Sequence, residues 1–331
     1  MKNIFFISVL LFVSLSIHSC GINEVDHNNY QPGFDPYTEI SSIDLDGNNL
    51  KPIIKGTNAK FVPSKNIIIF GLNDLYSINL DGSNLIRITN FNNLSIIIID
   101  NDIALNGEKI VISIWGNLYI VNYDGSNFTQ LTKSNNDLEP HFSQNNNRIV
   151  FRRDWNICTM NNDGTEFKYI SKHPDSSYYR NPYFVYNDRK ILYYEESKVL
   201  NNILTIHFYD LELQKDTIFV QIHPSGFQRT QVDVSQGNKI LFIESMFNRG
   251  AIRTFDFTNN EYLYICQGEY ASFSNDGNKI ILSNGQQIYS ISSNGTDKKL
   301  IYEVEDDKKW ISNPQFSSNN KIIFDKTYYM Y

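Results

Sequence analysis

Short runs of alternating apolar and polar residues, separated by polar turns, extend along most of this chain. Runs such as residues 117–121 and 287–291 are rich in β-branched and aromatic side chains, which favour strands. Pairs of the Asp-Gly type follow many of these runs and supply the positive φ angles that tight hairpins require. No helical pattern interrupts the runs. The pattern therefore predicts an all-β protein assembled from hairpins.

One phrase recurs seven times: an apolar anchor residue, often followed by Ser, then a polar turn, then Lys or Arg and a β-branched run. The anchors are Phe61, Ile103, Phe142, Phe184, Val234, Phe273 and Phe316. Successive anchors are 39 to 50 residues apart, which is the period of a propeller blade. We expect each anchor to begin an inner strand, A, with strand B following the turn.

A second phrase interleaves with the first and predicts strands C and D on either side of an Asp-Gly or Asn-Gly turn. Its glycines are Gly47, Gly82, Gly125, Gly164 and Gly295, and degraded copies lie near Asp210 and Asp256. Four antiparallel strands in each repeat make one β-propeller blade. Residues 38–54 contain only a C/D pair and residues 314–324 only an A/B pair.

These two half-blades predict how the ring closes. If residues 40–45 pair with residues 321–324, the N- and C-terminal half-blades form one composite blade and no sheet edge stays open at the seam. The fold class is then all-β, a seven-bladed β-propeller of four-stranded antiparallel blades spanning residues 37–331. The pattern leaves open whether residues 328–331 add a short strand of their own.

The repeated phrases resemble the TolB-type propeller repeat, most clearly over residues 117–132 and 139–143. That repeat occurs in the Tol-Pal translocation protein, in the N-terminal propellers of dipeptidyl-peptidase IV and prolyl oligopeptidases, and in envelope lipoproteins. The resemblance covers residues 37–331 and implies a propeller. Because the repeated residues are turn formers and core residues, it implies a fold and not an activity.

The N-terminus is typical of an exported protein. Lys2 precedes an apolar run over residues 4–17, which fits a signal peptide and is shorter than the roughly 20 residues that a bilayer-spanning helix needs. Ile17, Ser19 and Cys20 resemble the lipobox of bacterial lipoproteins, which implies a signal peptide over residues 1–19 and a lipidated Cys20; the alternative is an ordinary secretory signal with a chance cysteine. Residues 20–36 are polar and read as a flexible tether. Gly21 favours the outer membrane by analogy with sorting rules.

Composition and motifs exclude several functional classes. The chain has 36 acidic and 29 basic residues, a net charge of −7, and shows no basic stripe, which argues against a nucleic-acid partner. The three cysteines, Cys20, Cys158 and Cys266, are too far apart for a zinc knuckle or a redox pair, and we expect Cys158 and Cys266 to be unpaired. The sequence contains no nucleophile elbow, HExxH, P-loop or EF-hand motif. No cofactor is expected.

Candidate binding residues lie on the variable D-to-A and B-to-C connections, which share one face of a propeller. We expect a binding site in three consecutive blades, where arginines and aromatic residues gather as they do in interface hot spots. Its residues are Arg152, Arg153, Trp155, Tyr178, Tyr179, Arg180, Phe227 and Arg229, with Gln228 beside them. The alternative is that Trp155 and Tyr179 pack between blades while the arginines are solvated.

A metal site is the second hypothesis. His141, placed just before an inner strand, and His173 and His223, in D-to-A connections, fall in the same sector, with Gln228 or Gln231 available as a further ligand. Oligogalacturonide lyases, whose propellers have similar repeats, hold a divalent metal in this way. No spacing enforces convergence of these histidines.

The sequence thus favours a non-enzymatic lipoprotein of a bacterial cell envelope. We expect a monomer anchored to the outer membrane, facing the periplasm or the cell surface, that binds an envelope protein or glycan. The alternative is a metal-dependent polysaccharide lyase of the oligogalacturonide type.

Overall fold

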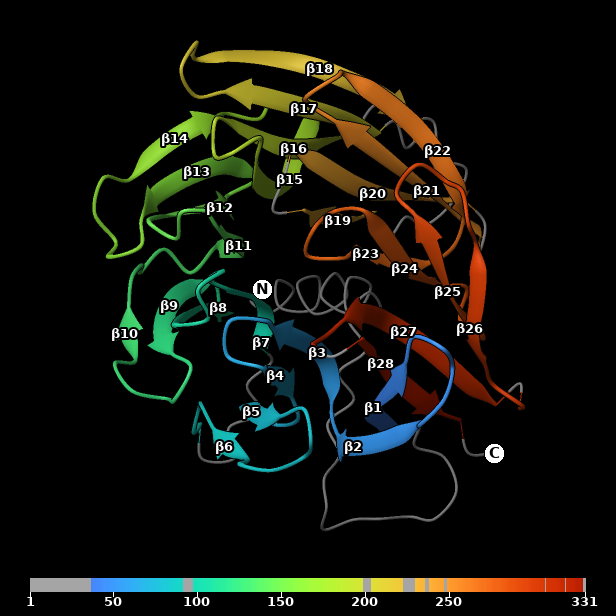
Figure 1. The fold of residues 1–331 in the computed structure, drawn as a ribbon. Coiled ribbons are helices and arrows are strands. Elements are labelled where there is room, and N and C mark those ends of the chain that lie inside the picture. Colours follow the sequence, from blue (N-terminus) through green and yellow to red (C-terminus); the bar gives the residue numbers. More distant parts are fainter. Residues whose placement is uncertain are drawn as a thin grey trace, which may run out of the picture.

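Seven four-stranded antiparallel sheets are arranged around a central axis in the computed structural model of the chain (Figure 1). The structure describes residues 37–91, 98–198, 204–222, 230–235, 238–246, 249–306, 308–318 and 320–329. The expected signal peptide, Cys20 and the tether lie outside these residues. The expected fold class, a seven-bladed propeller of four-stranded blades, is confirmed.

The first three blades follow one another along the chain, each with its strands in the order A, B, C, D from the axis outward. Blade 1 consists of β3 (Thr57–Val62), β4 (Ile67–Gly71), β5 (Leu75–Asn79) and β6 (Ile86–Arg87). Blade 2 consists of β7 (Ile98–Ile103), β8 (Lys109–Ile114), β9 (Asn117–Asn122) and β10 (Thr129–Gln130). Blade 3 consists of β11 (Asp137–Phe142), β12 (Arg148–Arg153), β13 (Asn156–Asn161) and β14 (Lys168–Ser171).

The next three blades repeat the same order. Blade 4 consists of β15 (Ser177–Val185), β16 (Lys190–Ser197), β17 (Leu204–Asp210) and β18 (Lys215–Ile222). Blade 5 consists of β19 (Thr230–Val234), β20 (Lys239–Met246), β21 (Arg249–Asp256) and β22 (Glu261–Gln267). Blade 6 consists of β23 (Tyr270–Phe273), β24 (Lys279–Ser283), β25 (Gln287–Ser292) and β26 (Lys299–Glu303).

Blade 7 joins the two ends of the described chain, as the half-blades predict. Its order from the outside inward is β2 (Lys51–Lys55), β1 (Tyr37–Asp44), β28 (Lys321–Tyr328) and β27 (Lys309–Phe316). β1 pairs with β28 from Tyr37 opposite Tyr328 to Asp44 opposite Lys321. Tyr328 ends β28 and β1 already holds the C position, so Tyr328 belongs to no additional strand; residues 330 and 331 lie outside the described residues.

The anchors end the inner strands and do not begin them, which corrects the expected position of strand A. Phe142 is the last residue of β11 and Phe273 the last of β23, and the phrase that follows each is the A-to-B turn. Strand A thus lies before the anchor, where polar residues alternate with apolar ones. The same correction places His141 inside β11 and not before an inner strand.

The Asp-Gly turns have the geometry that their chemistry predicts. In the turn between β5 and β6, Gly82 has a φ of 90°, and the Asp81 carboxylate accepts hydrogen bonds from the backbone N–H and hydroxyl of Ser83. The turn after β9 repeats this pattern with Gly125 at 85° and Asp124 bonded to Ser126. Each carboxylate is occupied by its own turn.

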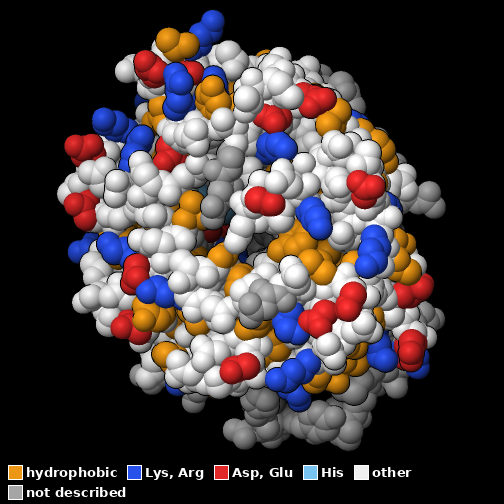
Figure 2. Space-filling view, in the orientation of Figure 1, with side chains coloured by type: hydrophobic (Ala, Val, Ile, Leu, Met, Phe, Trp, Pro, Cys, Tyr) orange, Lys and Arg blue, Asp and Glu red, His pale blue; other side chains and the backbone are white. Residues whose placement is uncertain are grey.

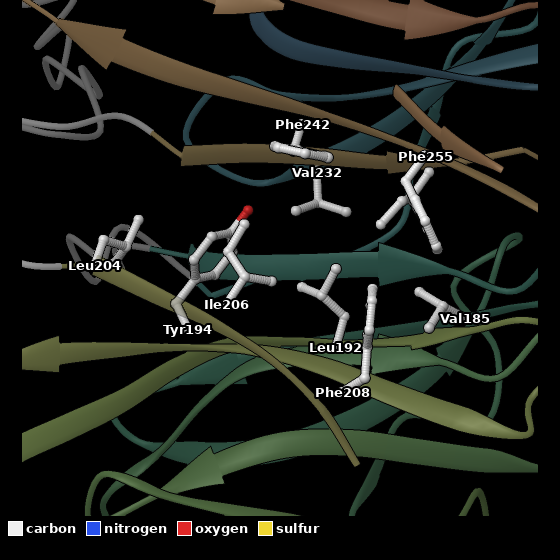
Figure 3. Close-up of a cluster of buried hydrophobic side chains, with 10 residues drawn as sticks. Val185, Leu192, Tyr194, Leu204, Ile206, Phe208, Val232, Phe242 and Phe255 are labelled. Atoms are coloured by element: carbon white, nitrogen blue, oxygen red, sulfur yellow. The ribbon is translucent and has the colours of Figure 1, made fainter. Parts of the chain in front are cut away.

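The core consists of apolar layers between blades. One layer joins Leu192 and Phe208 of blade 4 to Val232 and Phe242 of blade 5 (Figure 3). Each blade thus buries its faces against its neighbours, so removal of one blade would expose two layers. Within the described residues, Cys158 and Cys266 are free thiols, and no helix is long and apolar enough to cross a membrane.

Candidate functional site

The strand directions divide the propeller into two faces. In blade 3 the A-to-B turn at residues 143–147 and the C-to-D turn at residues 162–167 lie at one end, which we call the hairpin face. The B-to-C turn at residues 154–155 and the D-to-A connection at residues 172–176 lie at the other end, which we call the loop face. The face visible in Figure 2 carries interspersed charges of both signs with no extended patch of either.

Arg153 forms part of the blade framework. Its Nε and Nη2 donate to the two carboxylate oxygens of Asp137, at 2.6 and 2.8 Å, and Asp137 is completely buried. The pair connects the first residue of β11 to the last residue of β12, which face each other in the sheet. The hydrogen bonds that Arg153 donates to Asp137 raise the pKa of Arg153. Arg153 is therefore already matched to a carboxylate within its own blade.

Arg152 and Arg180 are also paired with carboxylates. The buried Arg152 lies with its Nε 3.2 Å from Oε2 of Glu139, which also accepts a hydrogen bond from the backbone N–H of Asn181. Arg180 forms an ion pair with Glu196, in which both side chains are about two-fifths exposed. Arg152, Arg153 and Arg180 are thus each paired with a carboxylate, and the idea that Arg152 and Arg153 are solvated is wrong.

The exposed Trp155 and the partly buried Tyr178 form an aromatic ledge. Their ring centroids lie 4.5 Å apart with the planes inclined by 47°. The guanidinium of Arg152 lies 4.2 Å from the Trp155 ring centre, and Nζ of Lys198 lies 4.1 Å from that of Tyr178. We call Arg152, Trp155, Tyr178 and Lys198 the aromatic ledge. Such cation–π contacts favour these ring positions in the free protein.

The backbone of the ledge is strained where Trp155 stands. Asp154 and Trp155 form the two-residue turn between β12 and β13, with φ angles of 47° and 65°. Bulky side chains seldom adopt this left-handed conformation, and such strain is concentrated at functional sites. Even so, Trp155 remains 37% exposed. Sterics and burial thus give no reason for a tryptophan at this position.

Tyr179 does not belong to the exposed part of the site. It is 8% exposed and packs with Val150 and Ile157 of blade 3 and with Ile191 and Tyr193 of blade 4. For Tyr179 the packing alternative is the correct one. The structure thus brings Trp155, Tyr178 and Arg180 together at the loop-face ends of blades 3 and 4, whereas Phe227, Gln228 and Arg229 lie outside the described residues.

His141 and His173 occupy opposite ends of the propeller. His141 lies near the hairpin-face end of β11, with Nδ1 3.6 Å from Asp102 and its ring 3.9 Å from that of Tyr183. His173 lies on the loop face, and its Nδ1 is 2.8 Å from the carbonyl oxygen of Pro174. Within the described ranges no group of three or more His, Cys, Asp or Glu side chains is arranged to hold a metal ion. His223, Gln228 and the side chain of Gln231 fall outside what the structure describes.

Sequence reasoning missed a set of polar contacts between neighbouring inner strands. Two carboxylates of β7 each accept a backbone N–H of β11. Asp100 accepts that of Glu139 at 3.1 Å, and Asp102 accepts that of Phe142 at 2.9 Å. Asp233 accepts from Phe273 in the same way, at 2.6 Å. Burial raises the pKa of Asp100 and of Asp233. In the sequence these aspartates stand one or three positions before an anchor: Asp100 and Asp102 precede Ile103, and Asp233 precedes Val234.

A hollow lies between blades 5 and 6. It has a volume of about 330 Å³ and is lined by Gly250, Gln267, Gly268, Glu269, Asn284, Tyr289 and Lys298. Nζ of Lys298 lies 4.2 Å from the Tyr289 ring centre. The lining mixes amide, carboxylate and ammonium groups without a converging set, so it offers space and no evident chemistry.

Comparisons with known proteins support the fold. No sequence-family model and no curated protein sequence matches the chain. A structure of oligogalacturonate lyase in complex with manganese is similar over 85% of this chain and 80% of its own, with a TM-score of 0.57 and 11% identity. A putative TolB from Agrobacterium tumefaciens is similar over 89% and 99%, with a TM-score of 0.54 and 12% identity. The β-propeller domain of Cps50 (Swd1) from Myceliophteria thermophila is similar over 81% and 96%, with a TM-score of 0.57 and 10% identity.

At 10 to 12% identity these similarities concern the fold alone. They confirm the TolB-type resemblance as a resemblance between propellers. A lyase, a putative TolB and the propeller domain of another protein share this architecture, so the architecture itself does not select a function.

Proposed function

We propose that this chain is a non-enzymatic lipoprotein of a bacterial cell envelope, anchored at the outer membrane through Cys20, that binds a protein or glycan partner at its loop face. The ledge and Arg180 form the docking surface. The observation that carries this proposal is the aromatic ledge, in which an exposed Trp155 in a strained turn is held by Arg152 and packed against Tyr178.

Preorganisation is the physical reason why the ledge suits binding. A partner that docks on free side chains must order them, at a cost of about 0.5–1.5 kcal/mol for each rotamer-rich side chain. Trp155 and Tyr178 are already held by Arg152 and Lys198. Aromatic anchors of this kind carry much of the energy in protein interfaces. Because the arginines are paired, we expect recognition to depend more on the rings than on a general attraction to anions.

Site-specific crosslinking tests the proposed surface. A photoreactive phenylalanine at position 178 should crosslink one defined partner in intact cells, and the same group at position 81 on the hairpin face should not. Crosslinking of the partner from position 81 but not from position 178 would show that the docking surface lies on the hairpin face, and it would contradict the proposal. The identity of the crosslinked molecule distinguishes a protein from a glycan.

Two further measurements test the other parts of the proposal. Mass spectrometry of the mature N-terminus should find an acylated Cys20, and an unmodified peptide that begins elsewhere would refute the anchor. Incubation with pectic oligosaccharides should produce no unsaturated-uronide absorbance, with or without added divalent metal. A metal-dependent rise in that absorbance would establish the lyase alternative.

A further inference from the structure

All three tryptophans of the chain lie on the loop face, and Trp115 is more exposed than Trp155 of the ledge. Trp115 lies in the B-to-C turn of blade 2 and is 60% exposed. Trp310 is the second residue of β27, the inner strand of blade 7, and packs over Gly285. Trp115 and Gly116 have φ angles of 50° and 71°, so the turn has the conformation for which Asn-Gly is the usual pair. A tryptophan at this tip is both exposed and strained, and neither property serves the fold.

Blade 1, the neighbour of blade 2, also presents an apolar tip. Leu72, in the B-to-C turn of blade 1, is 36% exposed. The turn of blade 2 lies against the chain that enters blade 3: the carbonyl oxygen of Gly116 accepts the backbone N–H of Asp137 at 2.7 Å, and a Cβ on Gly116 would lie 2.3 Å from the carbonyl oxygen of Asn135. Leu72 and Trp115 are therefore exposed apolar groups at equivalent positions of adjacent blades, held on rigid strands.

The first described residue, Tyr37, lies on the same face as these tips, in blade 7. β1 holds the C position of blade 7 and leads into the C-to-D turn on the hairpin face, so its first residue, Tyr37, lies on the loop face. Tyr37 stacks on Tyr328 with centroids 4.5 Å apart, and the next residue, Tyr329, is 43% exposed. Nζ of Lys55 lies 5.1 Å from the Tyr37 ring centre. Tyrosine and lysine thus surround the point where residues 20–36 connect to the propeller.

The connection is short enough to limit how far this part of the loop face can lie from a lipid attached at Cys20. Sixteen residues separate Cys20 from Tyr37, and fully extended they span at most about 55 Å. Blade 7 is adjacent to blade 1, and blade 1 to blade 2, so Tyr37, Leu72 and Trp115 lie on the same arc of the loop face. We call Tyr37, Lys55, Leu72, Trp115 and Tyr329 the tether-side rim.

We infer that the tether-side rim docks on the lipid surface, with Trp115 and Leu72 inserted at the level of the headgroups. Trp and Tyr favour this zone because an apolar ring meets hydrocarbon while the polar edge stays in water, and Lys reaches the headgroups from the same depth. The inference rests on the proposed lipid anchor. The aromatic ledge, at which we propose that the partner binds, lies further around the ring in blades 3 and 4.

Electrostatics do not drive this contact. Glu305 and Asp306 precede β27 on the same face and offset Lys55 and Lys309. The rim thus fits a zwitterionic surface through its apolar and aromatic groups, and an anionic surface is not required.

Fluorescence quenching tests the inference because every tryptophan reports on the loop face. The acylated chain is reconstituted in phosphatidylcholine vesicles whose acyl chains carry bromine, which quenches tryptophans that reach them. The wild-type chain should lose fluorescence. Trp115→Phe should abolish most of this loss, whereas Trp155→Phe, in the equivalent turn of blade 3, should retain it.

The outcomes separate the rim from the anchor. Mass spectrometry of the same sample establishes whether Cys20 is acylated. An acylated chain without quenching, or with quenching that Trp115→Phe leaves unchanged, overturns the rim alone. A chain without the acyl group overturns the anchor and the inference that rests on it. If an envelope extract shields Trp115 from acrylamide and vesicles do not, the occupant is a protein and the lipid assignment is wrong.

Discussion

Asp325 makes the ring closure dependent on pH. It is 3% exposed on β28 of blade 7, and its carboxylate accepts the backbone N–H groups of Asn58 at 2.8 Å and Ala59 at 3.4 Å, both on β3 of blade 1. Desolvation by burial raises the pKa of Asp325 from 3.8 to about 7, although the hydrogen bonds from Ala59 and Asn58 lower it in part. The group therefore retains a proton in the folded protein that the unfolded chain has already released.

The direction of the effect follows from proton binding. Well below the unfolded pKa of 3.8 both states hold the proton and Asp325 contributes no pH dependence. As the pH rises from 4 to 7, the unfolded state binds fewer protons than the folded state, so the free energy of unfolding falls. A difference of about three pKa units corresponds to at most about 4 kcal/mol over this window. About one pH unit above the folded pKa of about 7, both states have released the proton and the loss is complete.

Asp325→Asn removes this dependence while it keeps a carbonyl oxygen for the N–H of Asn58. We expect urea unfolding, monitored by circular dichroism between pH 4.5 and 7.5, to show that the free energy of unfolding of the variant increases relative to that of the wild type as the pH rises. Any cost of the new amide group shifts the variant curve by a constant. Asp81→Asn, on an exposed turn where hydrogen bonds from Ser83 lower the carboxyl pKa, should run parallel to the wild type. Parallel curves for wild type and Asp325→Asn would refute the reasoning.

Two further predictions concern packing and ion pairs. Phe324→Ala empties a fully buried position of the composite blade and should lower the free energy of unfolding by about 3–5 kcal/mol in one cooperative thermal transition; an early separate transition of blade 7 would contradict ring closure. Asp137→Ala leaves the largely buried Arg153 without its carboxylate and should cost about 3–5 kcal/mol in urea unfolding. Glu196→Ala, at the half-exposed pair with Arg180, should cost less than about 1 kcal/mol, and equal costs for the two variants would show that burial does not set the value of these pairs.

Local turn chemistry explains why the fold could be predicted. Asp-Gly pairs such as Asp81-Gly82 specify a hairpin within four residues, and an unpaired half-blade at each end of the repeat region requires a partner strand. The inner strands were harder to place because they carry polar residues. Asp100 and Glu139 lie where an apolar pattern was expected, since their side chains bind the backbone of the next blade.

The candidate site was only partly predictable because its charges pair across the sheet. Arg153 and Asp137 are sixteen residues apart, and only the register of β11 with β12 brings them together. The sequence thus suggested arginines that were available to a ligand, whereas in the structure Arg152, Arg153 and Arg180 are each paired with a carboxylate. Trp115 was overlooked because exposure of a turn tip depends on its position in the ring, and the residue itself gives no sign of it.

The central claim is that the loop face, at the ledge of blades 3 and 4, binds the partner. Isothermal titration of the partner crosslinked at position 178 tests it with Trp155→Asn, which removes the ring but keeps a residue suited to a positive φ angle. The account predicts that Trp155→Asn weakens binding by about 2 kcal/mol or more, roughly thirtyfold, as expected of an interface hot spot, while Asp81→Ala on the hairpin face leaves affinity unchanged. Full affinity in a folded Trp155→Asn variant, together with a loss in Asp81→Ala, would contradict it.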